Sequence, residues 1–305
     1  LFTYKTMDAF KFSKDDTITF RVPGRLPYRK YAWRNDRSKG LFWDAYREGK
    51  TTVTIGDRIY SGVKLTDEQM DFDLGSWATP AQLQVDAVVQ GFQDESVKAL
   101  EDAPYKVTIG LNNKDDAATM KRAFFEARRV LNGFRVPKEQ RFAVAGSNAA
   151  MIALEVASQI AGRADAALAN GTIGRIAGFD TFEDETMDAN AIYFFVPSAF
   201  VLYNDAPSVP QSAPFGRLIS GSGVKMRWIR DYDQEYQEER SSVTTYVSAA
   251  PVKDLFFKKS VYTQTESTVV LDPGTTQEFV RGIKLDLTAA ASTYPAAASA
   301  LAVES

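Results

Sequence analysis

The sequence predicts an α+β fold in which a long β-hairpin and a long helix precede a mixed body of helices and strands. Two runs of period-two alternation flank an aromatic segment near the N-terminus. The longest helical pattern of the chain follows at once, and strand signals dominate from residue 172 onward. The 305 residues, of which 45% are hydrophobic, suffice for one large domain or for two to three connected ones.

The hairpin begins with strand-like alternation at residues 17–22, which Pro23-Gly24 ends. Alternation returns at residues 51–55 and 59–65, so we expect these segments to form the second side of the hairpin. The segment between carries more aromatic side chains than a solvated loop needs, and aromatic residues are enriched at interface cores. They are Tyr28, Tyr31, Trp33, Phe42, Trp43 and Tyr46.

The long helix is predicted from local end signals and from apolar residues at helical spacing. Thr79 is a suitable N-cap, Pro80 suits the first helical position, and Gln82 completes a capping-box pattern with Thr79. The helix must end before Pro104, which gives about 24 residues and a length of roughly 36 Å. Gly91 costs the helix ~1 kcal/mol relative to alanine, so any bend is expected there.

Shorter elements follow, and their signals are weaker. We predict helices at residues 115–131 and 149–161, with a helical stub at 164–169. A Pro/Ser/Gly-rich loop is expected at 206–223, and the tail at 288–305 is Ala-rich and low in complexity. The predicted strands are 105–109, 142–145, 190–203, 225–230, 241–253 and 260–287.

The composition argues against catalysis. The chain has no cysteine and no histidine, which excludes disulfides, zinc-thiolate sites, Cys nucleophiles and the commonest general base. We therefore expect no catalytic residues, no metal and no cofactor. No apolar run approaches the roughly 18–20 residues that span a bilayer, so no membrane partner is expected.

Charge is unevenly placed along the chain. Residues 21–50 carry nine Lys or Arg against three acids, a local net charge of +6. Residues 65–105 carry nine acids against one Lys, a local net charge of −8. The overall charge of −3 hides this contrast between the hairpin and the helix region.

Two phrases in the second half of the chain carry a family resemblance. The first runs from Gly171 to Asp180 and reads G-T-I-G-R-I-A-G-F-D, and the second runs from Gly223 to Asp233 and reads G-V-K-M-R-W-I-R-D-Y-D. In this order, over about residues 10–287, the chain resembles the major capsid (coat) proteins of tailed bacteriophages. Encapsulins and herpesvirus capsid floor domains share that fold.

The resemblance implies a tailed-phage major capsid fold with six segments. The predicted boundaries are an N-terminal arm at 1–16, an extended hairpin loop at 17–66, a spine helix and peripheral domain at 67–140, a β-rich axial domain at 141–253, return strands of the peripheral domain at 254–287 and a C-terminal tail at 288–305. Gly174, Gly178, Phe179, Asp180, Arg227 and Asp231 are the expected axial-domain motif residues.

The resemblance also implies a function. A chain of this family assembles with itself through hexamers and pentamers into the icosahedral head that encloses double-stranded phage DNA without sequence-specific binding. The expected location is the virion, after assembly in the host cytoplasm. Scaffold, portal and cement proteins are further candidate partners.

Family members lay one subunit's hairpin over its neighbour, and the charge pattern of this chain suggests which surfaces meet. We predict that the basic hairpin lies against the acidic helix region of an adjacent copy; the alternative is that both are solvated faces. The predicted interface residues are Arg29, Lys30, Trp33, Arg34, Arg37, Phe42, Trp43, Tyr46, Arg47, Asp86, Asp94 and Glu95.

Other functions remain open at this point. The nearest is an encapsulin-type shell protein, and a different class is a carboxylate-based glycosidase or a phage adhesin. The glycosidase hypothesis would use Asp231, Asp233, Glu235, Glu238 and Glu239 as acid and base. The basic, aromatic hairpin also matches the pattern of single-strand binders, although a pI of about 5.3 does not favour nucleic-acid binding. The acidic run at 180–188 is interpreted as a solvated face or a weak cation site.

Overall fold

The computed structural model describes residues 3–6, 17–23, 43, 46, 48–74, 76–112, 116–159, 173–255 and 277–291. Contacts between Cα atoms divide the chain into two compact units. Unit 1 comprises Leu1–Ile18, Thr52–Ala103 and Phe200–Pro251, and unit 2 comprises Thr19–Thr51, Pro104–Ala199 and Val252–Ser305.

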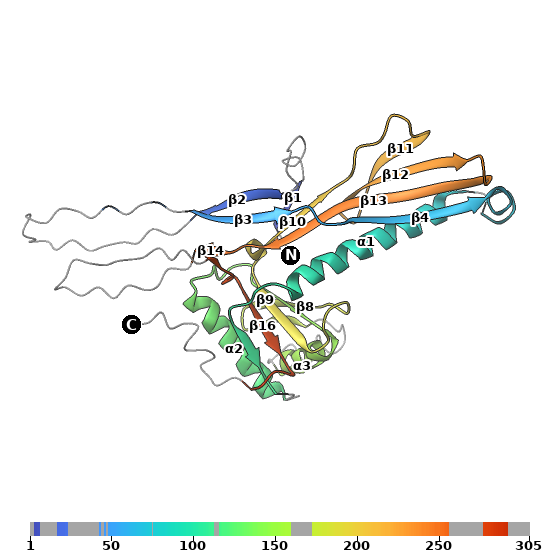
Figure 1. Cartoon of the computed structure of the whole chain (residues 1–305). Coiled ribbons are helices and arrows are strands. Elements are labelled where there is room, and N and C mark those ends of the chain that lie inside the picture. Colours follow the sequence, from blue (N-terminus) through green and yellow to red (C-terminus); the bar gives the residue numbers. More distant parts are fainter. Residues whose placement is uncertain are drawn as a thin grey trace, which may run out of the picture. The chain divides into compact units, whose positions relative to one another are not determined.

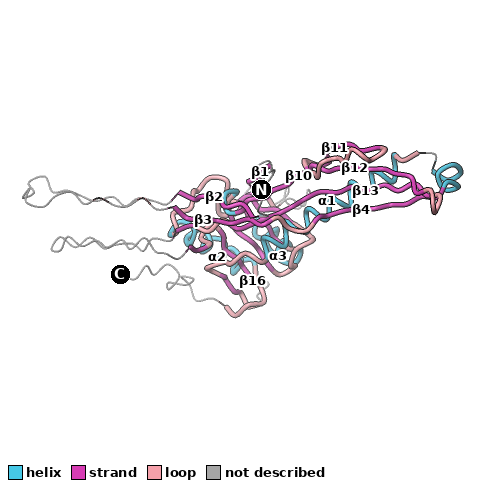
Figure 2. The backbone as a smooth tube through the Cα atoms, turned by 45° about the horizontal axis from the view of Figure 1, so that its top comes forward, coloured by secondary structure: helices cyan, strands magenta, loops and turns pink. Residues whose placement is uncertain are grey.

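Unit 1 is built on a six-stranded sheet around one long strand, β13 (Glu238–Pro251). β13 pairs antiparallel with three strands along its length, and β1 adds in parallel to β10. The sheet strands are visible side by side in Figures 1 and 2. Besides β13 they are β1 (Thr3–Thr6), β4 (Arg58–Thr66), β10 (Phe200–Asp205), β11 (Phe215–Gly221) and β12 (Val224–Asp233).

One face of this sheet is covered by helix α1 (Ala78–Glu101), which runs along β4 and β13 (Figure 1). Val88 of α1 packs into a core with Met226 and Val243 of the sheet. The helix has 24 residues, which confirms the predicted length and its end before Pro104. A six-residue π-helix, η2 (Gln69–Leu74), lies between β4 and α1 in the sequence.

The predicted N-cap of this helix is wrong. Trp77, and not Thr79, is the N-cap, and no side chain caps the first turn. Trp77 is 5% exposed, and its indole N–H donates to the carboxylate of Glu239, so tertiary packing positions the helix start. Gln82 likewise forms no capping box, because its Nε2 donates to Asp86 Oδ1 at 3.1 Å.

Gly91 in the middle of α1 has a packing role. A Cβ atom at this position would lie 3.0 Å from Cγ2 of Ile59, tighter than an ordinary contact. The glycine therefore allows α1 to approach β4 closely. That approach explains why a residue of poor helix propensity stands inside the longest helix.

Unit 2 contains a second six-stranded sheet with the order β5-β16-β9-β6-β8-β7. Helices α2 (Ala117–Gly133) and α3 (Ser147–Ser158) pack against each other and against this sheet. Its core is aromatic: the ring centroid of Phe124 in α2 lies 5.0 Å from that of Phe194 and 6.4 Å from that of Phe179. The strands are β5 (Thr108–Gly110), β6 (Phe142–Ala145), β7 (Gly174–Ile176), β8 (Phe179–Glu183), β9 (Ala191–Phe195) and β16 (Gly282–Asp286).

Small elements complete the described chain. Strands β2 (Thr17–Pro23) and β3 (Glu48–Thr54) form a two-stranded sheet, as do β14 (Asp254–Leu255) and β15 (Gln277–Glu278). A 3-10 turn, η3 (Pro197–Ala199), joins β9 to β10.

Two sequence predictions need correction, and two others are not tested by the described residues. The pairing of β2 with β3 confirms the hairpin, but β4 does not belong to it, because β4 pairs with β13. The predicted loop at 206–223 contains strand β11, paired with β12 over its whole length. The predicted helical stub at 164–169 and most of the predicted strand at 260–287 lie outside the described residues.

The contacts also group the chain differently from the predicted domain boundaries. Helix α1 shares unit 1 with β10–β13. The predicted boundaries instead place α1 with the peripheral domain and these strands in the axial domain. Helix α2 lies in unit 2 with β6–β9. The reason is strand pairing across long sequence separations: Lys64 of β4 pairs with Arg240 of β13.

Candidate assembly surfaces

The acidic residues predicted on the long helix lie on its solvent-facing side. Asp86, Asp94 and Glu95 are exposed, whereas Gln84 and Val88 of the same helix are buried against the sheet. Leu83 lies on the exposed side as well and is 64% exposed. Charge counting does not mark the apolar Leu83, but its position one turn before Asp86 places it on the same side of the helix.

The predicted basic partner surface is only partly described. Trp43 and Tyr46 are 90% and 56% exposed. At the base of the hairpin, Arg21 and Glu48 form an ion pair at 3.4 Å between β2 and β3. The remaining predicted hairpin contacts lie outside the described residues; they are Arg29, Lys30, Trp33, Arg34, Arg37, Phe42 and Arg47. The contact between hairpin and helix stays a prediction about two copies.

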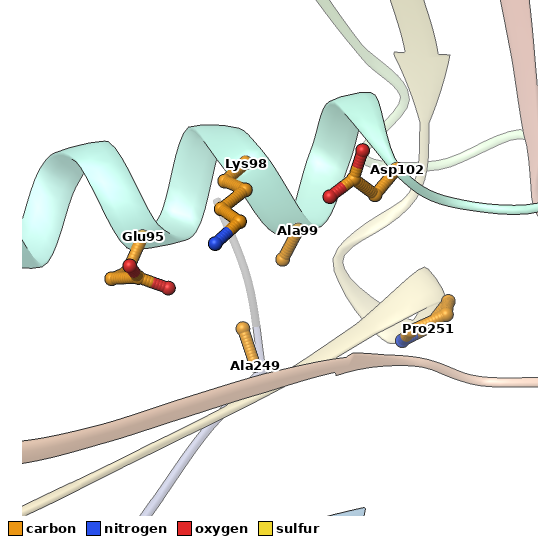
Figure 3. Close-up of a pocket in the computed structure, with 6 residues that line it drawn as sticks. All are labelled: Glu95, Lys98, Ala99, Asp102, Ala249 and Pro251. Carbon is orange, nitrogen blue, oxygen red and sulfur yellow. The ribbon is translucent and has the colours of Figure 1, made fainter. Parts of the chain in front are cut away.

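A shallow cavity of about 240 Å³ opens near the C-terminal end of α1 (Figure 3). Figure 3 shows Glu95 and Lys98 on the helix opposite Ala249 of β13, with Asp102 at the end of the helix. The two carboxylates outnumber the one ammonium group, and the C-terminal end of a helix carries partial negative charge. The cavity is therefore suited to a basic side chain. Its lining residues are Glu95, Lys98, Ala99, Asp102, Ala249 and Pro251.

A buried polar side chain fixes α1 on the sheet. Gln84 is 1% exposed, and its Nε2 donates to the carbonyl oxygens of Ser61 at 3.1 Å and Ser241 at 3.0 Å. Its Oε1 accepts from Ser241 Oγ at 2.6 Å, and Ser241 Oγ accepts in turn from Trp228 Nε1 at 2.8 Å. Because these bonds are directional, they set the rotation of α1 and so determine which side of it faces solvent.

The charged residues of the second phrase, Gly223–Asp233, form ion pairs and hydrogen bonds within unit 1. Asp231 and Asp233 of β12 both pair with Arg240 of β13, at 3.1 Å and 2.9 Å. Arg227 donates to the carbonyl oxygen of Ser208 at 2.8 Å. Burial lowers the pKa of Arg227, and the nearby Arg58 charge lowers it further. The two ion pairs of Arg240 therefore join the neighbouring strands β12 and β13.

Two glycines of the first phrase have a positive φ. Gly174 and Gly178 have φ values of 74° and 94°, in the left-handed region. Phe179 follows at 0% exposure, and its ring centroid lies 4.8 Å from that of Phe194. Asp180 pairs with Arg175 at 3.5 Å. These residues lie in unit 2, whereas the motif residues Arg227 and Asp231 lie in unit 1, so one axial domain does not hold both phrases.

The carboxylates of the glycosidase hypothesis are engaged in structural contacts. Glu238 pairs with Lys64 at 3.0 Å, and Glu239 accepts from the Trp77 indole. Asp231 and Asp233 share Arg240. A general acid and a general base need carboxylates directed at a common substrate. The arrangement of these four carboxylates favours a structural role.

No group of three or more Asp or Glu side chains in the described part could hold a metal ion. Within the same residues, no helix is both long enough and apolar enough to span a membrane.

The chain has the fold of tailed-phage major capsid proteins, because solved capsid structures match it along nearly its whole length. No protein-family model and no curated protein sequence matches the chain. A structure from Mycobacterium phage Che8 matches with a TM-score of 0.64 at 13% identity, over 93% of this chain and 89% of that one. The capsid structure of cyanophage P-SCSP1u matches with a TM-score of 0.62 at 12% identity, over 95% and 87%. The capsid of Ralstonia phage GP4 matches with a TM-score of 0.59 at 11% identity, over 96% and 88%.

Proposed function

We propose that this chain is a major capsid protein, which assembles with itself through hexamers and pentamers into the icosahedral head enclosing phage DNA. The observation that supports this proposal is the extent of the match: the similarity to phage capsids spans both units. Its role is structural and not catalytic, and its location is the virion, after assembly in the host cytoplasm. Scaffold, portal and cement proteins are partners under the same proposal.

The simplest test is assembly of the purified full-length protein. Size-exclusion chromatography followed by negative-stain electron microscopy should reveal rings or closed shells at high protein concentration. A monodisperse monomer under all conditions, also in the presence of crowding agents, would contradict the proposal. The contents of shells purified from cells separate a phage head from an encapsulin-type compartment, since the first holds DNA and the second holds a cargo enzyme.

Within this function, the hairpin of one copy binds the acidic side of α1 on a neighbour. Three features support this contact: the local charges of +6 and −8, the exposure of Asp86, Asp94 and Glu95, and the cavity at the C-terminal end of α1. An exposed ion pair stabilises by only ~0–1 kcal/mol. The contact therefore gains its strength from being repeated in every copy of the shell.

A charge-reversal pair tests this contact. The triple variant Arg29→Glu, Arg34→Glu, Arg37→Glu should fold but fail to assemble, because like charges would face each other. Adding Asp86→Lys, Asp94→Lys and Glu95→Lys to the same chain should restore particles. Normal particles from the first triple variant would exclude the contact. Circular dichroism and thermal melting of each variant control for misfolding.

A further inference from the structure

Unit 2 carries opposite charges at the two ends of its parallel strands. β6 and β8 run parallel, with Phe142 beside Asp180 at one end and Ala145 beside Glu183 at the other. The amide of Asp180 donates to the carbonyl of Arg141 at 2.9 Å, and the amide of Asp184 donates to the carbonyl of Ala145 at 3.0 Å. The segments preceding both strands therefore meet at one end of the sheet, and those following them meet at the other.

The end where the strands begin is basic. Arg128, Arg135 and Lys138 are exposed there, and we call these three residues the basic end. Arg128 is tied to this end because its Nη1 donates to the carbonyl of Ala177, in the turn before β8, at 3.2 Å. Glu139 is the one exposed carboxylate between Arg135 and Arg141 in the sequence.

A buried arginine adds to the positive potential at this end. Arg141 is 2% exposed. Its guanidinium donates to neutral oxygens only, among the described residues: the carbonyls of Pro137 at 2.8 Å and Val136 at 2.7 Å, and Asn132 Oδ1 at 3.0 Å. Burial lowers the pKa of Arg141, and the neighbouring Arg128 charge lowers it further. A positive charge with neutral partners projects its field to the nearby surface.

The opposite end is acidic and held in place. Glu183, Glu185 and Asp188 are exposed, and we call these three residues the acidic end. The sequence contains no Lys or Arg between Arg175 and Arg217. Buried Met187 anchors the loop. Five residues of β8 at ~3.3 Å each separate the two ends by about 17 Å.

We propose that the basic end of unit 2 binds the acidic end of unit 2 in a second copy of this chain, head to tail. Each copy then uses two different surfaces, and such heterologous contacts close into rings when the rotation between copies permits. The inference rests on the proposed capsid function and names a contact within its rings. It differs from the hairpin contact, since it uses no residue of the hairpin or of α1.

The decisive test is a charge swap in the full-length chain. Arg135→Glu with Lys138→Glu should reduce the fraction of assembled protein at least tenfold, and Glu183→Lys with Glu185→Lys should do the same. The four-substitution chain carries complementary ends again and should recover at least half of the wild-type particles. Arg217→Glu with Lys225→Glu, which removes the same charge from exposed positions in unit 1, is the matched control and should assemble normally.

Each other outcome overturns the inference. Normal assembly of both two-site variants shows that the ends do not meet. Loss of assembly that the four-substitution chain fails to recover shows that the two ends do not bind each other. Normal assembly of the first variant with loss of packaged DNA assigns the basic end to phosphate binding instead. If the wild-type chain forms no shells, the capsid proposal fails on its own. Sedimentation equilibrium at low salt then still compares self-association, and equal association constants for wild type and both variants overturn the head-to-tail contact.

Discussion

Gly146 occupies the point where β6 ends and α3 begins, and backbone atoms surround it. A Cβ atom there would lie 2.0 Å from the carbonyl oxygen of Asp188 and 2.7 Å from the Cα atom of Ala189. Neither neighbour is a flexible side chain that could turn aside. Because glycine has no Cβ atom, the loop of the acidic end can pack directly against the start of α3.

We expect Gly146→Ala to destabilise the subunit by ~3 kcal/mol, the upper end of what overpacking costs, because backbone must move. Gly62→Ala is the matched control: its Cβ would lie 4.0 Å from the nearest atom, and alanine favours a strand interior over glycine by ~0.5–1 kcal/mol. Urea unfolding of the unassembled subunit measures both. Equal midpoints for the two variants would contradict the packing argument.

Substituting Gln84 is expected to remove hydrogen bonds without changing the packed volume. Gln84→Leu keeps the side chain's approximate volume but leaves the hydroxyl of Ser241 without its acceptor at 2.6 Å. We expect a loss of ~1–3 kcal/mol in unfolding free energy. Gln90→Leu, at an exposed position of the same helix, should change stability by less than ~0.5 kcal/mol. A Gln84→Leu variant as stable as the wild type would show that packing alone orients α1.

At the scale of elements, the sequence predicted the features that residues close together in sequence determine. The end of α1 before Pro104, its length of 24 residues and the pairing of β2 with β3 followed from end signals and periodicity. The pairing of β4 with β13 did not, because alternation marks a strand without naming its partner. Trp77 replaced Thr79 as N-cap for a similar reason, since the Glu239 contact that supports it lies far away in sequence.

The junction of β10, β12 and β13 gives a prediction at this scale. Asn204 is fully buried; its Nδ2 donates to Thr245 Oγ1 at 2.7 Å, and its Oδ1 accepts from the amide of Lys225 at 2.7 Å. Asn204→Ala should therefore raise the hydrogen-exchange rate of the Lys225 amide at least tenfold, by opening the end of β12. The amide of Val63 is the internal control, because Val63 lies in β4, which pairs with β13 and not with β12. Equal protection of Lys225 in variant and wild type would contradict this role.

For the whole molecule, contacts between elements far apart in sequence group the chain differently from the predicted domains. Counting charges marks residues 65–105 as acidic, and Asp86, Asp94 and Glu95 of α1 are exposed; their contact with a second copy stays a prediction. The two ends of unit 2 did not emerge, because their charges lie about 50 residues apart in sequence and only the parallel pairing of β6 with β8 assigns them to opposite ends. The acidic run at 180–188 taken alone indicates only a solvated face or a weak cation site.

Both proposed contacts between copies are electrostatic, which fixes how assembly should respond to salt. The Debye length falls from ~10 Å at 0.1 M to ~3 Å at 1 M ionic strength, so exposed charges cease to attract across a forming interface. We expect the initial rate of assembly, followed by light scattering, to fall at least tenfold between 0.1 M and 1 M NaCl. Sucrose at matched osmolality is the control and should not slow assembly. The four-substitution charge-swap chain should keep the same salt dependence, because it exchanges the signs of the ends without removing charge. If assembly instead accelerates with salt, burial of apolar surface drives it, and side chains such as Leu83, Trp43 and Tyr46 become the residues to substitute next.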